Sequence, residues 1–195
     1  MKKISYALGL NIAHNLKSAK INEIDVVSFS KAIADKLLEK EQEITDQEAQ
    51  QILNDFFTKK EQEANKAVIA EGAEFLAKKE QETGVVKLNS GLLYKVINEG
   101  NGQTPKATDK VKCHYEGTLI DGTVFDSSYK RGQAATFPVN GVIQGWVEAL
   151  QLMKEGAKWE LYIPYNLAYG AQGAGQLIGP YSTLIFTVEL ISIEK

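Results

Sequence analysis

The chain has 195 residues and a net charge of −3, which disfavours nucleic acid as a main partner because phosphate binding needs a concentrated positive surface. Hydrophobic residues make up 44% of it, so it can bury a core, and wholesale disorder is excluded. Its one cysteine, Cys113, excludes an internal disulfide and a multi-cysteine metal site. No run approaches the ~18 apolar residues of a membrane span, so we expect none.

The opening stretch, MKKISYALGLNIAHNLKSAK, admits two interpretations. Two early lysines before apolar residues resemble a signal peptide, but polar residues interrupt the run and no convincing cleavage site follows. Apolar residues instead repeat at every fourth position, as on one stripe of a helix: Ile4, Leu8, Ile12 and Leu16. We therefore expect a retained helix and a cytoplasmic protein, with a periplasmic or outer-membrane-associated location as the alternative.

Glycine and proline divide the chain near residue 84. All four prolines lie beyond residue 104, and only two of the 16 glycines precede Gly84. This distribution predicts a helical front and a turn-rich back. In the front we expect helices over residues 3–18 and 26–40, and a long one from the Thr45–Glu48 capping box to about Glu82. The expected domains are a helical dimerisation domain (1–44), a connecting helix (45–83) and a second domain (84–195).

The expected front helices have apolar faces that one chain cannot readily cover. The second carries Val26, Phe29, Ile33 and Leu37 on one side. At 1.5 Å per residue the third would be roughly 50 Å long, too long for a small domain to bury. The faces are covered either by loose packing on the back half or by a second copy of the chain, and we expect a homodimer.

The back half alternates like strands. We expect strands over residues 91–97, 110–119, 158–164 and 182–193, and a short helix over 145–153. In the second strand, alternation places Cys113 and Tyr115 on one face and His114 on the other. The expected fold is α+β, with a curved antiparallel sheet wrapped around one short helix.

Ordinary enzyme chemistry finds little support in this half. His14 and His114 lie in different halves, outside any metal-ligand pattern, and we expect His114 to face solvent and Cys113 to be a small core residue. There is no G-x-S-x-G motif, and no helix pattern follows the glycine-rich YGAQGAGQLIG, which indicates a loop. The Asp-Gly pair at residues 121 and 122 is better explained as a turn, which leaves Asp126 as a lone carboxylate beside Phe125.

A set of aromatic and branched residues remains, and it forms either a plain core or the lining of a pocket. Tyr169 lies in a turn, and Val142 and Ile143 precede a helix, positions better suited to a pocket than to a core. The set is Tyr115, Phe125, Val142, Ile143, Trp146, Tyr169, Ile178 and Phe186.

Four separated motifs resemble the FKBP-type peptidyl-prolyl cis-trans isomerases: HYEGTLIDGTVFDSS, FPVNGVIQGW, IPYNLAYG and STLIFTVEL. The similarity covers residues 85–195. The whole chain is similar to the dimeric bacterial branch that includes the macrophage infectivity potentiator, whose members carry a helical dimerisation domain and a long connecting helix. The stretch ISYALGLNIAHNLK looks like the opening of that helical domain.

The resemblance implies a proline pocket with Trp146 as its floor. It implies hydrogen bonds to substrate carbonyls from the Tyr169 hydroxyl and the Ile143 backbone N–H, and an Asp126 carboxylate oriented by Tyr115. By the same resemblance, apolar contacts come from Phe125, Phe137, Val142, Ile143, Trp146, Ile178 and Phe186. It also implies that no metal or cofactor is needed.

Two departures from the family pattern concern the rim of this pocket. Ala135 stands where many members have an aromatic ring, with Phe137 at the next inward position, and Gly179 stands where many have proline. Macrolide inhibitors are implied ligands, with an affinity that these two positions would change. The other implied partners are proline-containing peptides and unfolded client proteins. The alternative function is a non-catalytic module that only grips proline-containing segments.

Overall fold

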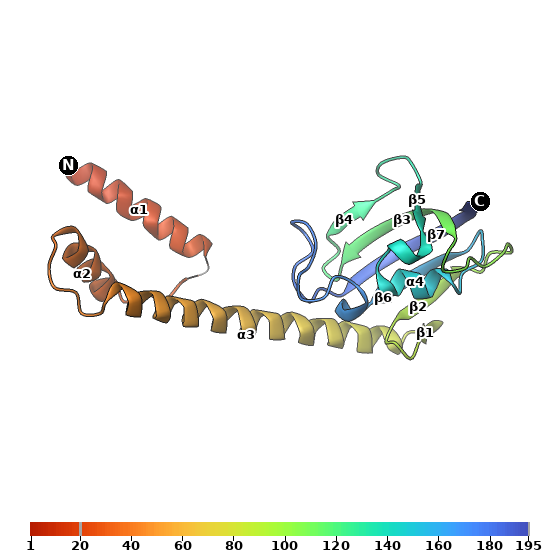
Figure 1. Cartoon of the computed structure of the whole chain (residues 1–195), viewed down its shortest axis with the longest axis horizontal. Coiled ribbons are helices and arrows are strands. Elements are labelled where there is room, and N and C mark those ends of the chain that lie inside the picture. Colours follow the sequence, from red (N-terminus) through yellow and green to blue (C-terminus); the bar gives the residue numbers. More distant parts are fainter. Residues whose placement is uncertain (20, 195) are drawn as a thin grey trace. The chain divides into compact units, whose positions relative to one another are not determined.

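The computed structural model describes residues 1–19 and 21–194 (Figure 1). They fall into two compact units, one of residues 1–57 and one that starts at Thr58, and the helix α3 (Asp46–Glu80) contributes to both. Each unit is described by itself below. None of the described helices is both long and apolar enough to cross a membrane.

The first unit is all helical. It contains α1 (Lys2–Ser18), α2 (Val26–Leu37) and the first turns of α3. The expected capping box is confirmed: the Thr45 N–H donates to Glu48 Oε2 at 2.8 Å, and the Glu48 N–H donates to Thr45 Oγ1 at 3.2 Å. The helix α2 ends three residues before the expected position, because Glu39 adopts a left-handed backbone with φ of 54°.

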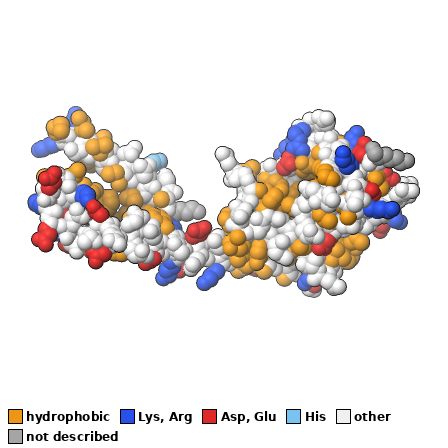
Figure 2. Space-filling model, viewed as in Figure 1, with side chains coloured by type: hydrophobic (Ala, Val, Ile, Leu, Met, Phe, Trp, Pro, Cys, Tyr) orange, Lys and Arg blue, Asp and Glu red, His pale blue; other side chains and the backbone are white. Residues whose placement is uncertain are grey.

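Apolar side chains of the first unit remain uncovered. No residue of α1 is buried, and Ile4 and Leu8 are each about 60% exposed. Figure 2 shows hydrophobic side chains on the surface of these helices. Between α1 and α2 lies an open groove of about 650 Å³, lined mainly by Ile12, Ala13, Leu16, Ile21, Ile24, Val26, Phe29 and Ile33.

The second unit is an antiparallel sheet of seven strands with one short helix, as expected. The strand order is β1-β2-β6-β7-β3-β4, and β5 pairs with β3 beside β4. The sequence pattern predicted the longer strands and the helix, but not the short β1, β4 and β5. The elements are β1 (Val85–Lys87), β2 (Leu93–Asn98), β3 (Lys110–Leu119), β4 (Val124–Ser127), β5 (Ala135–Pro138), α4 (Gln144–Leu150), β6 (Lys158–Ile163) and β7 (Leu184–Glu194).

The core lies between one face of this sheet and α4. Along β3 and β7, alternate side chains point to this face and most of them are buried, and α4 contributes its apolar stripe. We call this the inner face of the sheet. The central members of the core, from this face and from α4, are Val111, Cys113, Trp146, Ala149, Leu150, Leu161, Val188 and Leu190.

The last turns of α3 pack on the opposite, outer face of the sheet. The Phe75 and Tyr162 rings meet edge to face with centroids 6.1 Å apart, and Lys79 Nζ lies 5.0 Å from the centroid of Tyr162. A Cβ atom on Gly72 would lie 2.4 Å from Thr183 Oγ1, so only glycine permits this approach. The last turns of α3 are therefore part of the same compact unit as the sheet. The expected domain limit at Gly84 stays a prediction.

Candidate functional site

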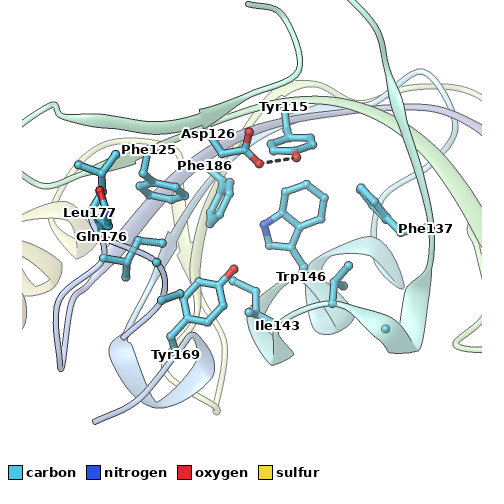
Figure 3. Close-up of a pocket in the computed structure, with 15 residues that line it drawn as sticks. Tyr115, Phe125, Asp126, Phe137, Ile143, Trp146, Tyr169, Gln176, Leu177 and Phe186 are labelled. Carbon is cyan, nitrogen blue, oxygen red and sulfur yellow. Dashed lines mark hydrogen bonds between the residues drawn. The ribbon is translucent and has the colours of Figure 1, made fainter. Parts of the chain in front are cut away.

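An open cavity of about 630 Å³ lies at one end of α4, against the inner face of the sheet (Figure 3). Residues from β3, β4, β5, β7, α4, the segment just before α4 and the loop between β6 and β7 line it. Every residue that the sequence singled out for the pocket is among them: Tyr115, Phe125, Asp126, Phe137, Val142, Ile143, Trp146, Tyr169, Ile178 and Phe186.

Aromatic rings form the base of the cavity around Trp146, which is 3% exposed. Its indole meets Tyr115, Phe137 and Phe186 edge to face, with centroid distances of 5.3, 5.4 and 5.2 Å. Among the described side chains, Trp146 Nε1 and Trp159 Nε1 are buried without a hydrogen-bond partner. These edge-to-face contacts stabilise the indole of Trp146 in this position, so the base presents an apolar surface.

Glycine in β3 makes room for two of these rings. A Cβ atom on Gly117 would lie 2.5 Å from the Phe125 ring and 2.7 Å from the Phe186 ring. The two phenylalanines therefore pack directly against the backbone of β3, with their centroids 5.4 Å apart. Their position explains why the motif around HYEGTL carries glycine where the alternation of a strand would allow a side chain.

Phe137 supplies a wall that the departure at Ala135 had put in question. Both residues belong to β5, and Phe137 lines the cavity with its ring 6.2 Å from that of Tyr115. Ala135 and Gly179 are not among the residues that line it. The aromatic base is thus closed on the β5 side without a ring at position 135.

A carboxylate stands at the edge of this apolar base. The Tyr115 hydroxyl donates to Asp126 Oδ2 at 2.6 Å, as the expected orientation of Asp126 by Tyr115 requires. Sequence reasoning missed Arg131, whose guanidinium donates both to Asp126 Oδ1 and, at 2.9 Å, to the Tyr115 hydroxyl. The signal was available: Arg131 follows Asp126 by five residues in the next turn, where a charged partner can reach back.

This network determines the charge of Asp126. Burial of the carboxyl group raises its pKa, but hydrogen bonds from Tyr115 and Arg131, with the positive charge of Arg131, outweigh burial. The pKa of Asp126 consequently lies below its ordinary value. The cavity therefore has an ionised carboxylate at neutral pH.

Two residues that line the cavity, Tyr169 and Ile143, have a hydrogen-bond donor with no acceptor among the described residues. The Tyr169 hydroxyl points into the space in front of Trp146 (Figure 3), and burial followed by the negative charge of Asp126 raises the pKa of Tyr169. The hydroxyl therefore keeps its proton at neutral pH. Across the described residues, the Ile143 backbone N–H, just before α4, also lacks an acceptor. Both donors are available to a ligand.

Five lining residues were not foreseen. Four come from the loop before β7, among them Leu177, which is 52% exposed, and the fifth precedes α4. Their adjacency to Ile178 was the available signal, but a glycine-rich loop has no periodicity from which side-chain direction can be read. They are Gly141, Ala174, Gly175, Gln176 and Leu177.

Two residues considered for other chemistry lie outside the cavity. Cys113 is fully buried, and burial raises the pKa of its thiol to about 12, so it is a core residue. His114 is on the outer face, as alternation predicts, but it does not simply face solvent. Its ring stacks on that of Tyr129 with centroids 4.8 Å apart.

Comparisons with known proteins extend over the whole chain. A family model described as FKBP-type peptidyl-prolyl cis-trans isomerase matches residues 101–191, and a model of the domain amino-terminal to such isomerases matches residues 1–96. The FKBP-type 22 kDa peptidyl-prolyl cis-trans isomerase of Escherichia coli strain K12 is 44% identical over 192 residues. That alignment covers 97% of this chain and 93% of the relative.

A second relative and a solved structure agree with this match. The protein named Outer membrane protein MIP, from Legionella longbeachae, is 42% identical over 200 residues, which cover 99% of this chain and 85% of the relative. The crystal structure of FkpA from Escherichia coli is similar with a TM-score of 0.78 and 36% identity. This structural match covers 98% of this chain and 95% of the FkpA chain.

Proposed function

This chain belongs to the FKBP-type peptidyl-prolyl cis-trans isomerases, and from that premise we propose that the cavity around Trp146 is where it rotates X–Pro bonds. The observation that carries the proposal is a single juxtaposition. An aromatic base, an ionised carboxylate and the Tyr169 hydroxyl face the same space, and Ile143, whose backbone N–H lacks an acceptor among the described residues, lines it too.

The reaction requires no nucleophile. The barrier to rotation, roughly 18–20 kcal/mol, arises from the loss of amide resonance as the C–N bond twists. The twisted amide has less charge separation than the planar one, so an apolar cavity destabilises the planar form more. The pyrrolidine ring lies on Trp146 among the surrounding rings, and catalysis is preferential binding of the twisted form.

Polar groups at the edge hold the peptide in place. The Tyr169 hydroxyl and the Ile143 N–H donate to substrate carbonyl oxygens on either side of the proline. Asp126, held by Tyr115 and Arg131, acts on the twisted amide through its charge. Phe125, Val142, Ile178 and Phe186 complete the apolar walls.

Kinetics of two variants test these roles. Asp126→Ala should lower kcat/KM on a proline-containing peptide by more than it lowers the free energy of unfolding, because Asp126 packs at the cavity edge rather than in the core. Tyr169→Phe should weaken peptide or macrolide binding by about 1 kcal/mol, the value of one hydrogen bond. Wild-type kinetics in Asp126→Ala would remove Asp126 from the site. An unchanged rotation rate at saturating wild-type protein would instead support the non-catalytic binding module.

The first unit, residues 1–57, which we call the helical unit, has a separate proposed role. This role is to join two chains. The support is the α1–α2 groove and the absence of any buried residue in α1. In such a dimer two cavities serve one client protein, and unfolded proteins with accessible prolines are the expected clients.

The compartment is the remaining proposal. The expected cytoplasmic location finds no support among the relatives, one of which is named an outer membrane protein. We therefore favour the alternative, a periplasmic or outer-membrane-associated protein. Fractionation of the source cells tests this, and recovery with cytoplasmic markers alone would contradict it.

A further inference from the structure

The turn after β4 connects the cavity to the outer face of the sheet. Arg131 and Tyr129 lie two residues apart in this turn, and their side chains contact different surfaces. Arg131 bonds Asp126 and the Tyr115 hydroxyl at the cavity edge, although Arg131 itself does not line the cavity. Its side chain is 50% exposed, and its hydrogen bonds at the cavity edge go to these two partners.

Tyr129 is fixed to three strands of the outer face. Its ring stacks on His114 of β3, 4.8 Å between centroids and 14° from parallel. Its hydroxyl donates to Glu189 of β7 at 2.9 Å, and Lys158 Nζ of β6 lies 5.4 Å from its ring centroid. The sheet register pairs His114 with Glu189 and Glu189 with Lys158, so these three residues form one continuous row under the ring.

The backbone between these two side chains is also restrained. The Gly132 N–H donates to the Tyr129 carbonyl at 3.0 Å, and Gly132 has φ of 68°. At the start of the turn, the fully buried Ser128 hydroxyl accepts from the Tyr115 N–H at 2.7 Å and lies 3.0 Å from His114 Nδ1. Tyr129 and Arg131 therefore belong to one short segment with hydrogen bonds at both of its ends.

We propose that Tyr129 is a remote positioning residue that, by fastening this turn to the outer face of the sheet, keeps Arg131 on Asp126 and Tyr115. The proposal rests on the proposed role of Asp126 in the reaction. An exposed arginine that must be ordered for each ion pair contributes little, because the entropy lost cancels the attraction. A turn that is already anchored loses less entropy, so Arg131 spends more of its time paired.

A double-mutant cycle tests whether Tyr129 acts through Arg131. We expect Tyr129→Ala to lower kcat/KM on a proline peptide about threefold to tenfold in the full-length chain, and Tyr129→Phe, which keeps the stacked ring, to lower it less. In an Arg131→Ala background, Tyr129→Ala should cause no further loss. The control is Ile191→Ala, because Ile191 lies on β7 and is 39% exposed, as Tyr129 is; its kinetics should stay unchanged.

A second measurement separates this proposal from the role of Asp126 itself. Carboxyl ¹³C chemical shifts, assigned with Asp126→Asn, report the titration of Asp126 without any catalysis. Both Tyr129→Ala and Arg131→Ala should move that titration to higher pH, and Arg131→Lys should partly restore it. Additive losses of kcat/KM, or an Asp126 titration that Arg131→Ala shifts and Tyr129→Ala does not, would overturn the proposal. If Asp126→Ala has wild-type kinetics but the titration shifts as expected, only the catalytic role of Asp126 fails.

Discussion

A helix and a strand of this chain use their apolar residues in opposite ways. Along β7, alternate side chains such as Val188 and Leu190 are completely buried between the sheet and α4. In α1, which has apolar residues at every fourth position, Ile4 and Leu8 are about 60% exposed. The pattern of the strand is satisfied within one chain, whereas the pattern of the helix is not. The sheet unit therefore covers its apolar faces within one chain, while the helical unit leaves apolar side chains exposed, which supports the proposed dimer.

Removal of the Trp146 side chain at the floor of the cavity should have the largest effect on stability and activity. We expect this effect to be confined to the sheet unit, the unit that starts at Thr58. Trp146→Ala removes a buried ring that contacts three other rings, so we expect the sheet unit to lose about 3–5 kcal/mol of unfolding free energy and isomerase activity to disappear. Urea unfolding and peptide kinetics measure the two effects. Sedimentation should still give a dimer, and a monomer would mean that the two units are not independent.

A charged residue in the α1–α2 groove should weaken dimerisation and leave the activity of the cavity unchanged. Phe29 lines the groove, and we expect Phe29→Asp to weaken dimerisation by about 3 kcal/mol, roughly a hundredfold, because a carboxylate would be buried at the interface. Sedimentation at micromolar concentration checks this, while kcat/KM on a short peptide should not change. The control is Val27→Asp, a neighbour that is 77% exposed and does not line the groove. A wild-type protein that sediments as a monomer would refute the dimer outright.

The contact between α3 and the sheet should produce a smaller effect. Gly72→Ala places a methyl group against Thr183 Oγ1, so we expect a destabilisation of about 1–2 kcal/mol even after the gain in helix propensity. The partner variant Thr183→Ala removes that oxygen, and the double variant should lose less than the two single variants together. Additive losses in urea unfolding would show that the close approach does not matter.

The smallest expected effect concerns pH. Because the folded-state pKa of Asp126 lies below its ordinary value of 3.8, its ionisation stabilises the fold above the unfolded-state pKa, and this contribution is lost as pH falls through the folded-state pKa. The difference in unfolding free energy between the wild type and Asp126→Asn should be constant from about pH 7 to pH 5 and shrink below about pH 4. A difference that does not change down to pH 2 would mean that Asp126 is not held as an ion.

The sequence predicted what periodicity and motif spacing encode. The strand over residues 110–119, the capping box at Thr45 and the residues around the cavity base all follow from local pattern or from family resemblance. Arg131 and the rim residue Leu177 were missed because turns and glycine-rich loops have no period. The packing of Gly72 on Thr183 could not be foreseen, since it joins residues more than a hundred positions apart.

The central claim is that the cavity is complete in the sheet unit and that the helical unit serves large clients. A fragment starting at Thr58 keeps the turns of α3 that cover Tyr162 and Thr183, and it can be compared with the full chain at equal cavity concentration. We predict the same kcat/KM on a short proline peptide, within about twofold. On a protein whose refolding is limited by proline isomerisation, the fragment should be several-fold slower, because it lacks the second cavity that raises the effective concentration of client. Equal rates on the refolding protein would contradict the role of the helical unit, and loss of activity on the peptide would show that the cavity is not complete without it.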